Sequence, residues 1–116
     1  FFWSVYAYAW EYCAEMVMSD AAGDGWNGAY YTFTSVTSGE VVETGTLALG
    51  WSGSDEVCLL DGCYMLEVVG GDFDEEISWT FVTIAGGAPY GPTELDVVWG
   101  VFHSSNCTTS APTERP

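Results

Sequence analysis

The chain has almost no cationic side chains. Its 116 residues contain no lysine, one arginine and one histidine beside 17 acidic residues, so the formal net charge is −16. Nucleic acids and anionic membranes are bound mainly through lysine and arginine, and we therefore expect neither as a partner. Self-repulsion of this size opposes compaction unless bound cations or counterions offset it. The composition favours a divalent cation, or a saline surrounding, instead.

Long apolar runs and helical periodicity are also missing. No apolar run reaches the length of a membrane span, and no segment repeats its apolar residues at helical spacing. Short segments alternate apolar and polar residues between clusters of Gly, Asp and Ser, which is typical of strands. We predict an all-β fold, an antiparallel β-sandwich of about seven or eight short strands. The predicted strands are 1–10, 12–19, 29–36, 40–48, 54–60, 63–69, 76–84 and 95–103.

Composition divides this one-domain chain into three parts. Residues 1–10 carry no charge, 11–107 contain the predicted sandwich, and 108–116 are rich in Thr, Ser and Pro. The tail is similar to an O-glycosylated stalk or a frayed end. Asn106 begins an N-x-T pattern and is a candidate glycosylation site. Because the chain begins at Phe1 rather than Met, we expect a removed signal peptide or a partial chain.

The four cysteines predict two disulfides, for which three connectivities exist. A four-residue loop over 59–62 would place Cys58 opposite Cys63, close enough to bridge. We therefore expect the pairs Cys58–Cys63 and Cys13–Cys107, the second of which closes a loop of almost the whole domain. A metal site is a weaker alternative, because no second cysteine pair has matching spacing. Paired cysteines indicate an oxidising compartment, so we predict a secreted, extracellular protein.

The segment 20–28, DAAGDGWNG, combines two carboxylates, a carboxamide and three glycines directly after an apolar segment. Glycines permit a tight turn at positive φ, so the oxygens of Asp20, Asp24 and Asn27 can face one centre. Such oxygens are the ligands that Ca²⁺ prefers, although the spacing matches only part of the EF-hand pattern. The segment also suits a glycine-rich turn whose Asp and Asn cap their own backbone. The candidate residues of a structural Ca²⁺ site are Asp20, Asp24, Trp26, Asn27 and, from an adjacent strand, Glu76.

Four short motifs follow one another in this chain: GDGWNG, TGTL, CLLDGCY and EISW. The first motif ends the segment 20–28, and the others occupy residues 44–47, 58–64 and 76–79, with a Gly-Gly step at 70–71. In this order they resemble a small domain of secreted and surface proteins from algae, other protists and some bacteria. The resemblance covers roughly residues 11–107 and implies a β-rich, extracellular structural or adhesive module without an assigned enzyme activity. Ala21 departs from the pattern, which has a polar residue there, and residues 1–10 lie outside it.

The N-terminal segment 1–10 is apolar on both of its alternating faces. It is either the first strand of its own sandwich or a strand that adds to the sheet of a neighbouring subunit. We favour the second, because a strand with two apolar faces needs cover on both sides. Head-to-tail addition repeats into a filament unless it closes into a ring. The candidate assembly residues are Phe1, Phe2, Trp3, Val5, Tyr6, Tyr8 and Trp10.

Catalytic patterns are weak, and we do not expect an enzyme. Gly50–Ser54 is not a nucleophile elbow, and His103 is the only histidine that a serine or cysteine could use. We predict a structural subunit of an extracellular fibre or surface layer, stabilised by Ca²⁺ and disulfides. The alternative is a carbohydrate-binding or adhesive module of a larger secreted protein. Its candidate residues are the loop aromatics, for example Trp26, Trp51 and Tyr90.

Overall fold

The computed structural model describes residues 11–98, 101–103 and 107. These residues form β1 (Glu11–Asp20), β2 (Tyr30–Ser35), β3 (Val41–Gly45), β4 (Ser52–Leu60), β5 (Gly62–Val69), the 3₁₀ helix η1 (Asp74–Glu76), β6 (Ile77–Phe81), β7 (Ile84–Gly86), β8 (Tyr90–Val98) and β9 (Val101–His103). The predicted strand 1–10, the glycosylation candidate Asn106 and the tail 108–116 lie outside the described residues. Within the described ranges, no helix is long and apolar enough to cross a membrane.

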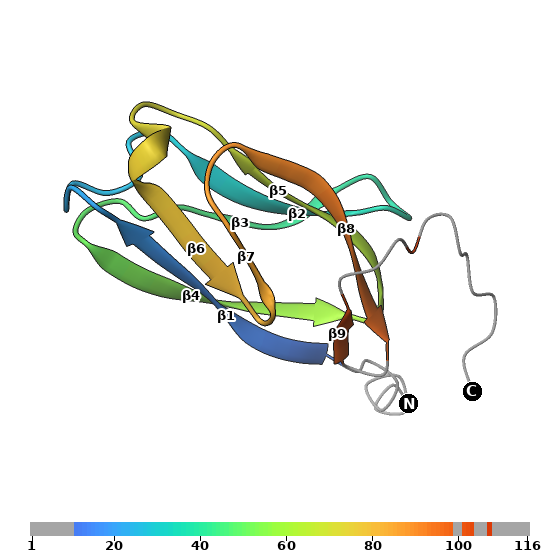
Figure 1. The fold of residues 1–116 in the computed structure, drawn as a ribbon. Helices are drawn as coiled ribbons and strands as arrows, with labels where there is room; N and C mark the ends of the chain where they lie inside the picture. Colours follow the sequence, from blue (N-terminus) through green and yellow to red (C-terminus); the bar gives the residue numbers. More distant parts are fainter. Residues whose placement is uncertain (1–10, 99–100, 104–106, 108–116) are drawn as a thin grey trace.

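The strands form two sheets that pack face to face (Figure 1). One sheet has the order β4-β1-β6-β7 and the other the order β3-β2-β5-β8-β9. Every pairing between neighbouring strands is antiparallel. The predicted all-β antiparallel sandwich is therefore confirmed.

The core lies between the sheets and follows from the period-two alternation of each strand. In β6, the side chains of Ile77, Trp79 and Phe81 are buried, whereas the two residues between them are exposed. Phe33 of β2 meets Phe81 of β6 across the sandwich, with ring centroids 5.0 Å apart. Phe81 in turn contacts Phe102 of β9 at 5.1 Å. Aromatic rings thus join the two layers along the middle of the core.

The two disulfides connect Cys13 to Cys58 and Cys63 to Cys107, so the predicted pairing was wrong. The prediction assumed a hairpin between the strands that carry Cys58 and Cys63. Instead, the chain passes at Asp61 from β4 in one sheet to β5 in the other, which separates these cysteines. Cys13 and Cys58 are direct cross-strand neighbours in the pairing of β1 with β4.

Two predicted strands are each split by a turn. The segment 76–84 contains β6 and the first residue of β7, and the two strands are joined by the two-residue turn Val82-Thr83. The segment 95–103 likewise contains the end of β8 and the whole of β9. The first turn has no glycine, and Val82 adopts φ 56°, a conformation that is uncommon for a β-branched residue. The alternation of apolar and polar residues therefore continues through a reversal of the chain that has no turn residue, so one strand was predicted where there are two.

A hydrogen bond between Tyr31 of β2 and Asp55 of β4 connects the two sheets. The hydroxyl of Tyr31, whose side chain is only 1% exposed, donates to Asp55 Oδ2 at 2.8 Å. A Cβ at Gly45 would lie 2.5 Å from that oxygen and 2.7 Å from the hydroxyl, so glycine makes room for the pair. Burial, the bond to Asp55 and the negative charges of Asp55 and Glu43 raise the pKa of Tyr31 above its ordinary value.

We expect Tyr31→Phe to lower the free energy of unfolding at pH 7 by about 2 kcal/mol, because a bond to a charged acceptor is lost. The raised pKa lets folded Tyr31 keep its proton at pH values where unfolded tyrosine loses it. This contribution is complete below about pH 10 and is lost as the pH rises further. Urea unfolding at pH 7 and 10.5 should therefore show a smaller difference from wild type at the higher pH. Tyr30→Phe, at an exposed neighbour, should change stability by less than about 0.5 kcal/mol; an equal effect of both variants would contradict the argument.

Candidate metal centre

The loop between β1 and β2 folds tightly because several of its residues adopt positive φ. These residues are Gly23, Gly25, Asn27 and Gly28, with φ angles of 80°, 86°, 53° and 96°. At Gly25 a side chain is also sterically excluded, because a Cβ would lie 2.5 Å from the carbonyl oxygen of Ala48. The glycines that the sequence singled out therefore bring this loop against the segment between β3 and β4.

Trp26 anchors the loop in the core and is fully buried. Its indole Nε1 donates to the carbonyl oxygen of Ser19 at 3.0 Å, and its backbone N–H donates to that of Leu47 at 2.8 Å. Its own carbonyl oxygen accepts from the N–H of Ala29 at 3.1 Å. Trp26, predicted as a site residue, thus holds the loop in place from beneath and does not belong to the carboxylate group described next.

Three carboxylates converge at this end of the sandwich. Asp20, Asp24 and Glu76 each offer a ligand oxygen, and these atoms lie within 4.8 Å of one another. Asp20 ends β1 and Asp24 lies in the loop, whereas Glu76 ends η1 immediately before β6. Pairing of β1 with β6 brings them together, since the N–H of Ala21 donates to the carbonyl oxygen of Glu76 at 2.9 Å. The structure therefore unites three of the predicted ligands from two distant segments.

Two oxygens of this group are buried without a hydrogen-bond partner, Asp20 Oδ1 and Glu76 Oε1. The side chain of Asp20 is only 2% exposed. Its other oxygen, Oδ2, accepts from the N–H of Asp24 at 2.9 Å. Buried carboxylate oxygens are normally satisfied by donors or by a metal ion. The two unpartnered oxygens are therefore free to accept a cationic ligand.

The charge state of the group follows from its surroundings. Burial acts to raise the pKa of Asp20, but hydrogen bonds to Asp24 and to the backbone of Gly23 and Ala22 outweigh it and lower this pKa. Burial and the negative charges of Asp20, Asp24 and Glu75 raise the pKa of Glu76. The surroundings therefore favour the ionised form of Asp20, whereas Glu76 ionises against burial and the repulsion of its neighbours.

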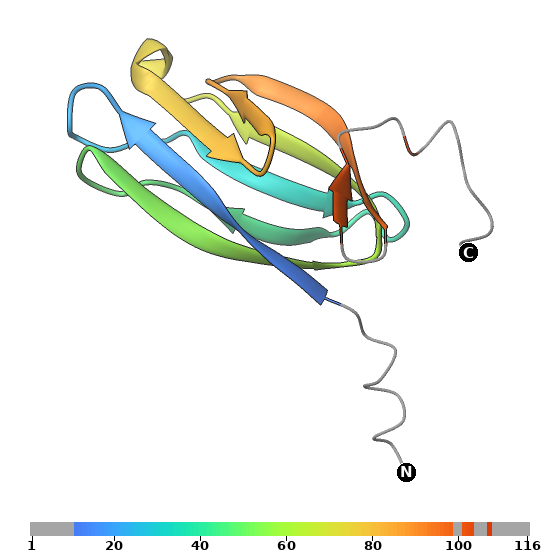
Figure 2. The ribbon, with the colours of Figure 1, turned by 60° about the horizontal axis from the view of Figure 1, so that its bottom comes forward.

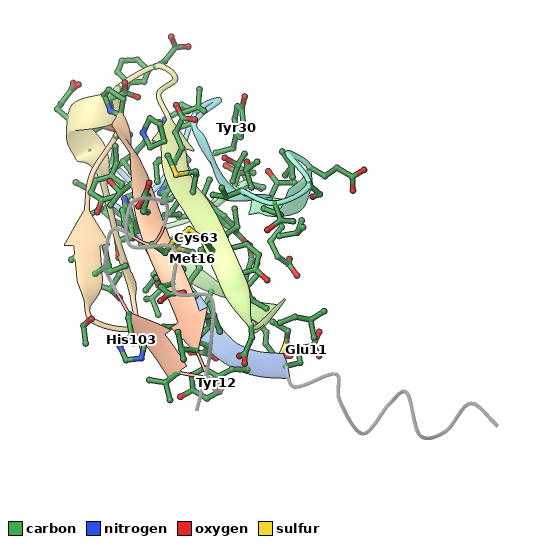
Figure 3. The ribbon with its side chains drawn as sticks, turned by 90° about the vertical axis from the view of Figure 1, so that its right-hand side faces the viewer. Glu11, Tyr12, Met16, Tyr30, Cys63 and His103 are labelled. Carbon is green, nitrogen blue, oxygen red and sulfur yellow. A yellow bond between two sulfur atoms is a disulfide. The ribbon has the colours of Figure 1, made fainter. Side chains whose placement is uncertain are left out.

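No protein cation neutralises this cluster within the described ranges, which contain neither lysine nor arginine. Their single histidine, His103, lies near Tyr12 at the end where β1 begins (Figure 3). Tyr30, which follows the loop directly, lies at the opposite end of the molecule in the same view. A hard cation from solution is therefore the partner that the donor set fits. Two oxygens on opposite sides of one Ca²⁺ are about 4.8 Å apart, so three ligand oxygens that lie within 4.8 Å of one another can share one ion.

The other predicted site residues have different roles. Asn27 donates from Nδ2 to Asp24 Oδ1 and to the carbonyl oxygen of Gly25, both at 3.2 Å, so it positions Asp24. Among the loop aromatics, Trp51 is 66% exposed, whereas Tyr90 is half-buried against Trp79. The candidate assembly residues within 1–10 lie outside the described residues.

Two further groups of potential ligands each contain two cysteines. They are Glu11 with Cys13 and Cys58, and Glu94 with Cys63 and Cys107. Their cysteines are joined in disulfides and offer no thiolate to a metal. The carboxylate group at the β1–β2 loop is therefore the candidate metal centre among the described residues.

Sequence reasoning did not assign the segment 47–51 to this centre. Its backbone accepts from the N–H groups of Asp20, Gly25 and Trp26 through Trp51, Gly50 and Leu47, at 2.8, 3.2 and 2.8 Å respectively. The Gly-Trp pair at 50–51 was the only available signal in the sequence, and nothing local indicates that it lies against a loop some 25 positions earlier.

Comparison with known proteins finds no matching family model, no similar curated protein and no similar solved structure.

Proposed function

We propose that the protein is a structural subunit of an extracellular fibre or surface assembly, in which residues 1–10 of one copy add a strand to the next copy. The observation that carries this proposal is an open strand position beside the first half of β1. The two disulfides are compatible with the oxidising conditions outside the cell.

The open position results from unequal pairing on the two sides of β1. On one side, β4 pairs with β1 from Glu11 to Ser19. On the other side, β6 pairs only with Met16–Asp20. In the part of the chain that the structure describes, no strand therefore flanks Glu11–Glu15 on the β6 side. Figure 2 shows this half of β1 extending beyond the turn between β6 and β7.

The backbone of this half-strand faces the open position. The Cα atoms of Cys13 and Cys58 are 3.9 Å apart, the close spacing of a pair without mutual backbone hydrogen bonds. The N–H and C=O groups of Cys13, and by alternation those of Glu11 and Glu15, hence point away from β4. Further along the chain, Ala21 follows the same alternation and donates to Glu76 on the β6 side. Unpaired backbone of this kind is a template for an added strand.

Exposed apolar side chains surround the same end of the sandwich. Tyr12, Leu60 and Val101 are 44%, 48% and 50% exposed. The ring of Tyr12 packs on Phe102 with centroids 4.9 Å apart, which places these residues beside the half-strand. A donor segment that is apolar on both faces, as residues 1–10 are, would cover this surface while its backbone pairs with β1.

The proposal includes a structural Ca²⁺ bound by Asp20, Asp24 and Glu76. The ion would satisfy the two buried oxygens and offset part of the net charge of −16 that opposes subunit packing. A glycan at Asn106 is the proposed covalent modification. The cation centre lies at the far end of β1 from the open strand position, so the two features can be tested separately.

Electron microscopy of the secreted protein in Ca²⁺ tests the assembly, with the full chain compared with a deletion of residues 1–10. We expect filaments from the full chain alone, because the deletion removes the donor strand. Monomers from both proteins would overturn the structural role. Filaments from both would show that assembly does not use the N-terminal segment.

The acceptor position has a sharper test in Glu15→Pro. Proline removes the one N–H that this residue directs at the open position and leaves the hydrogen bonds between β1 and β4 in place. We expect this variant to remain monomeric with a melting temperature within a few degrees of wild type. Glu15→Ala removes the same charge but keeps the N–H, and should still form filaments. Normal filaments from Glu15→Pro would place the acceptor elsewhere.

A further inference from the structure

The exposed indole of Trp51 lies directly on the loop of the candidate metal centre. A Cβ at Gly23 would collide with three atoms of the Trp51 indole, so glycine lets the ring rest on the backbone between Asp20 and Asp24. The backbone of Trp51 is fixed, because the carbonyl oxygen of Trp51 accepts a hydrogen bond from the N–H of Asp20 at 2.8 Å. Trp51 nevertheless remains 66% exposed. One aromatic face is thus held against the loop while much of the ring faces solvent.

The metal centre itself is open on one side. Ca²⁺ takes six to eight oxygen ligands, and three carboxylates fill only part of that number. Asp20 is buried beneath the loop, whereas Asp24 is exposed, so the remaining coordination positions face solvent. Three ionised carboxylates around a doubly charged ion leave a net charge of −1. The open positions therefore favour neutral oxygen ligands over a further anion.

We propose that this end of the molecule binds a neutral saccharide: two neighbouring hydroxyls of the sugar coordinate the Ca²⁺ held by Asp20, Asp24 and Glu76, and the ring stacks on Trp51. A vicinal diol supplies two neutral oxygens at a spacing that one ion can accept. The C–H groups on one face of a pyranose are weakly positive and suit the electron-rich face of an indole. The inference goes beyond the structural role and rests on the cation that is part of it.

A lipid surface fits the same end less well. Leu49 is 79% exposed and, with Trp51, could enter a membrane interface. However, a net charge of −16 repels anionic headgroups, and the chain has no lysine to reverse that repulsion. The indole of Trp51 is also held against Gly23 in the loop between β1 and β2, which suits stacking of a ligand more than insertion.

The test uses the full chain with methyl α-D-mannopyranoside and methyl β-D-galactopyranoside, followed by saturation-transfer NMR in Ca²⁺ and in EDTA. Cyclohexanol, a ring without a vicinal diol, is the negative probe. We expect saturation transfer to at least one sugar in Ca²⁺, its loss in EDTA and no transfer to cyclohexanol. Trp51→Ala should lose at least tenfold in sugar affinity and keep the wild-type thermal shift with Ca²⁺. Leu49→Ala, in the same segment, should bind both ligands as wild type does.

The outcomes separate the sugar site from the cation on which it depends. A thermal shift with Ca²⁺, without saturation transfer to either sugar, would overturn the saccharide proposal and leave the proposed cation site in place. Sugar binding that survives in Trp51→Ala would also overturn it, because stacking would then play no part. If Ca²⁺ caused no shift in the melting temperature, both the cation site and the saccharide site that depends on it would be overturned. The protein could instead bind neutral phosphatidylcholine vesicles and not bind either sugar. If Leu49→Ala abolished that vesicle binding, the surface would be assigned to lipid and the saccharide proposal would be overturned.

Discussion

Chelation of calcium with EDTA is expected to lower the free energy of unfolding of the wild-type protein by about 4 kcal/mol, relative to a solution in which free Ca²⁺ exceeds its dissociation constant about 1,000-fold. The physical reason is that the folded protein collects Asp20, Asp24 and Glu76 within 4.8 Å, whereas the unfolded chain disperses them. A ligand that binds only the folded state stabilises it by mass action. Urea unfolding at several Ca²⁺ concentrations measures this dependence.

Asp20→Asn separates the cation from the fold. The asparagine side chain keeps an oxygen that can accept the N–H of Asp24, but it removes the negative charge beside Glu76. We expect this variant to fold in EDTA with a modest loss of stability, because the hydrogen bonds that lower the pKa of Asp20 stabilise its ionised form. Added Ca²⁺ should then give almost no further stabilisation. A variant that simply fails to fold would instead show no cooperative unfolding transition under either condition.

The neighbours Glu75 and Glu76 provide a matched pair of controls. Glu76→Gln removes a charge whose Oε1 is buried without a partner, whereas Glu75→Gln removes the same charge from an exposed side chain. We expect the first variant to lose most of the stabilisation by Ca²⁺ and the second to keep it. Equal Ca²⁺ responses in wild type and both variants would contradict the assignment of the centre, since general screening of charge would explain them.

Removal of the Cys13–Cys58 disulfide has the second large expected effect. The bridge spans 45 residues, for which the chain-entropy account gives a loss of about 4 kcal/mol on removal. The double variant Cys13→Ala/Cys58→Ala should therefore have a free energy of unfolding that is lower by that amount, and its urea midpoint should fall accordingly. It should also unfold with a larger dependence on urea, because the unfolded chain is less compact. The bridge joins adjacent strands on the outside of one sheet, so the core stays filled.

The connectivity has its own measurement and control. Proteolysis without reduction, followed by mass spectrometry, should yield peptides joined through Cys13 and Cys58 and others joined through Cys63 and Cys107. The single variant Cys13→Ala would leave Cys58 as a free thiol that reacts with iodoacetamide. A free thiol at Cys107 in that variant would instead match the pairing that the sequence alone suggested.

Local chemistry explains why the sequence predicted the loop better than the disulfides. The positive-φ glycines and the oxygen side chains of segment 20–28 act over a few residues, and their conformation can be inferred from neighbours alone. Glu76 was predicted as a ligand from an adjacent strand, and the pairing of β1 with β6 brings it to Asp20. Trp26 was predicted as a site residue, but its burial makes it an anchor of the loop.

The disulfides and Trp51 depended on information that no short segment contains. Cys58 and Cys63 are near in sequence, but the crossing from β4 to β5 at Asp61 places them in different sheets. A hairpin and a crossing between sheets can carry the same turn residues, so the sequence pattern cannot distinguish them. The contact between Trp51 and Gly23 likewise depends on where two loops meet.

Alternation of side chains along each strand and the tight, acidic turn of one loop can be read directly from this chain. Both arise from the covalent geometry of neighbouring residues, which is present before the chain folds. The choice of strand partners, the cysteine pairs, the open side of β1 and the position of Trp51 over the loop arise from packing between distant segments. These contacts are selected by burial of the whole core and exist only once the two sheets have come together.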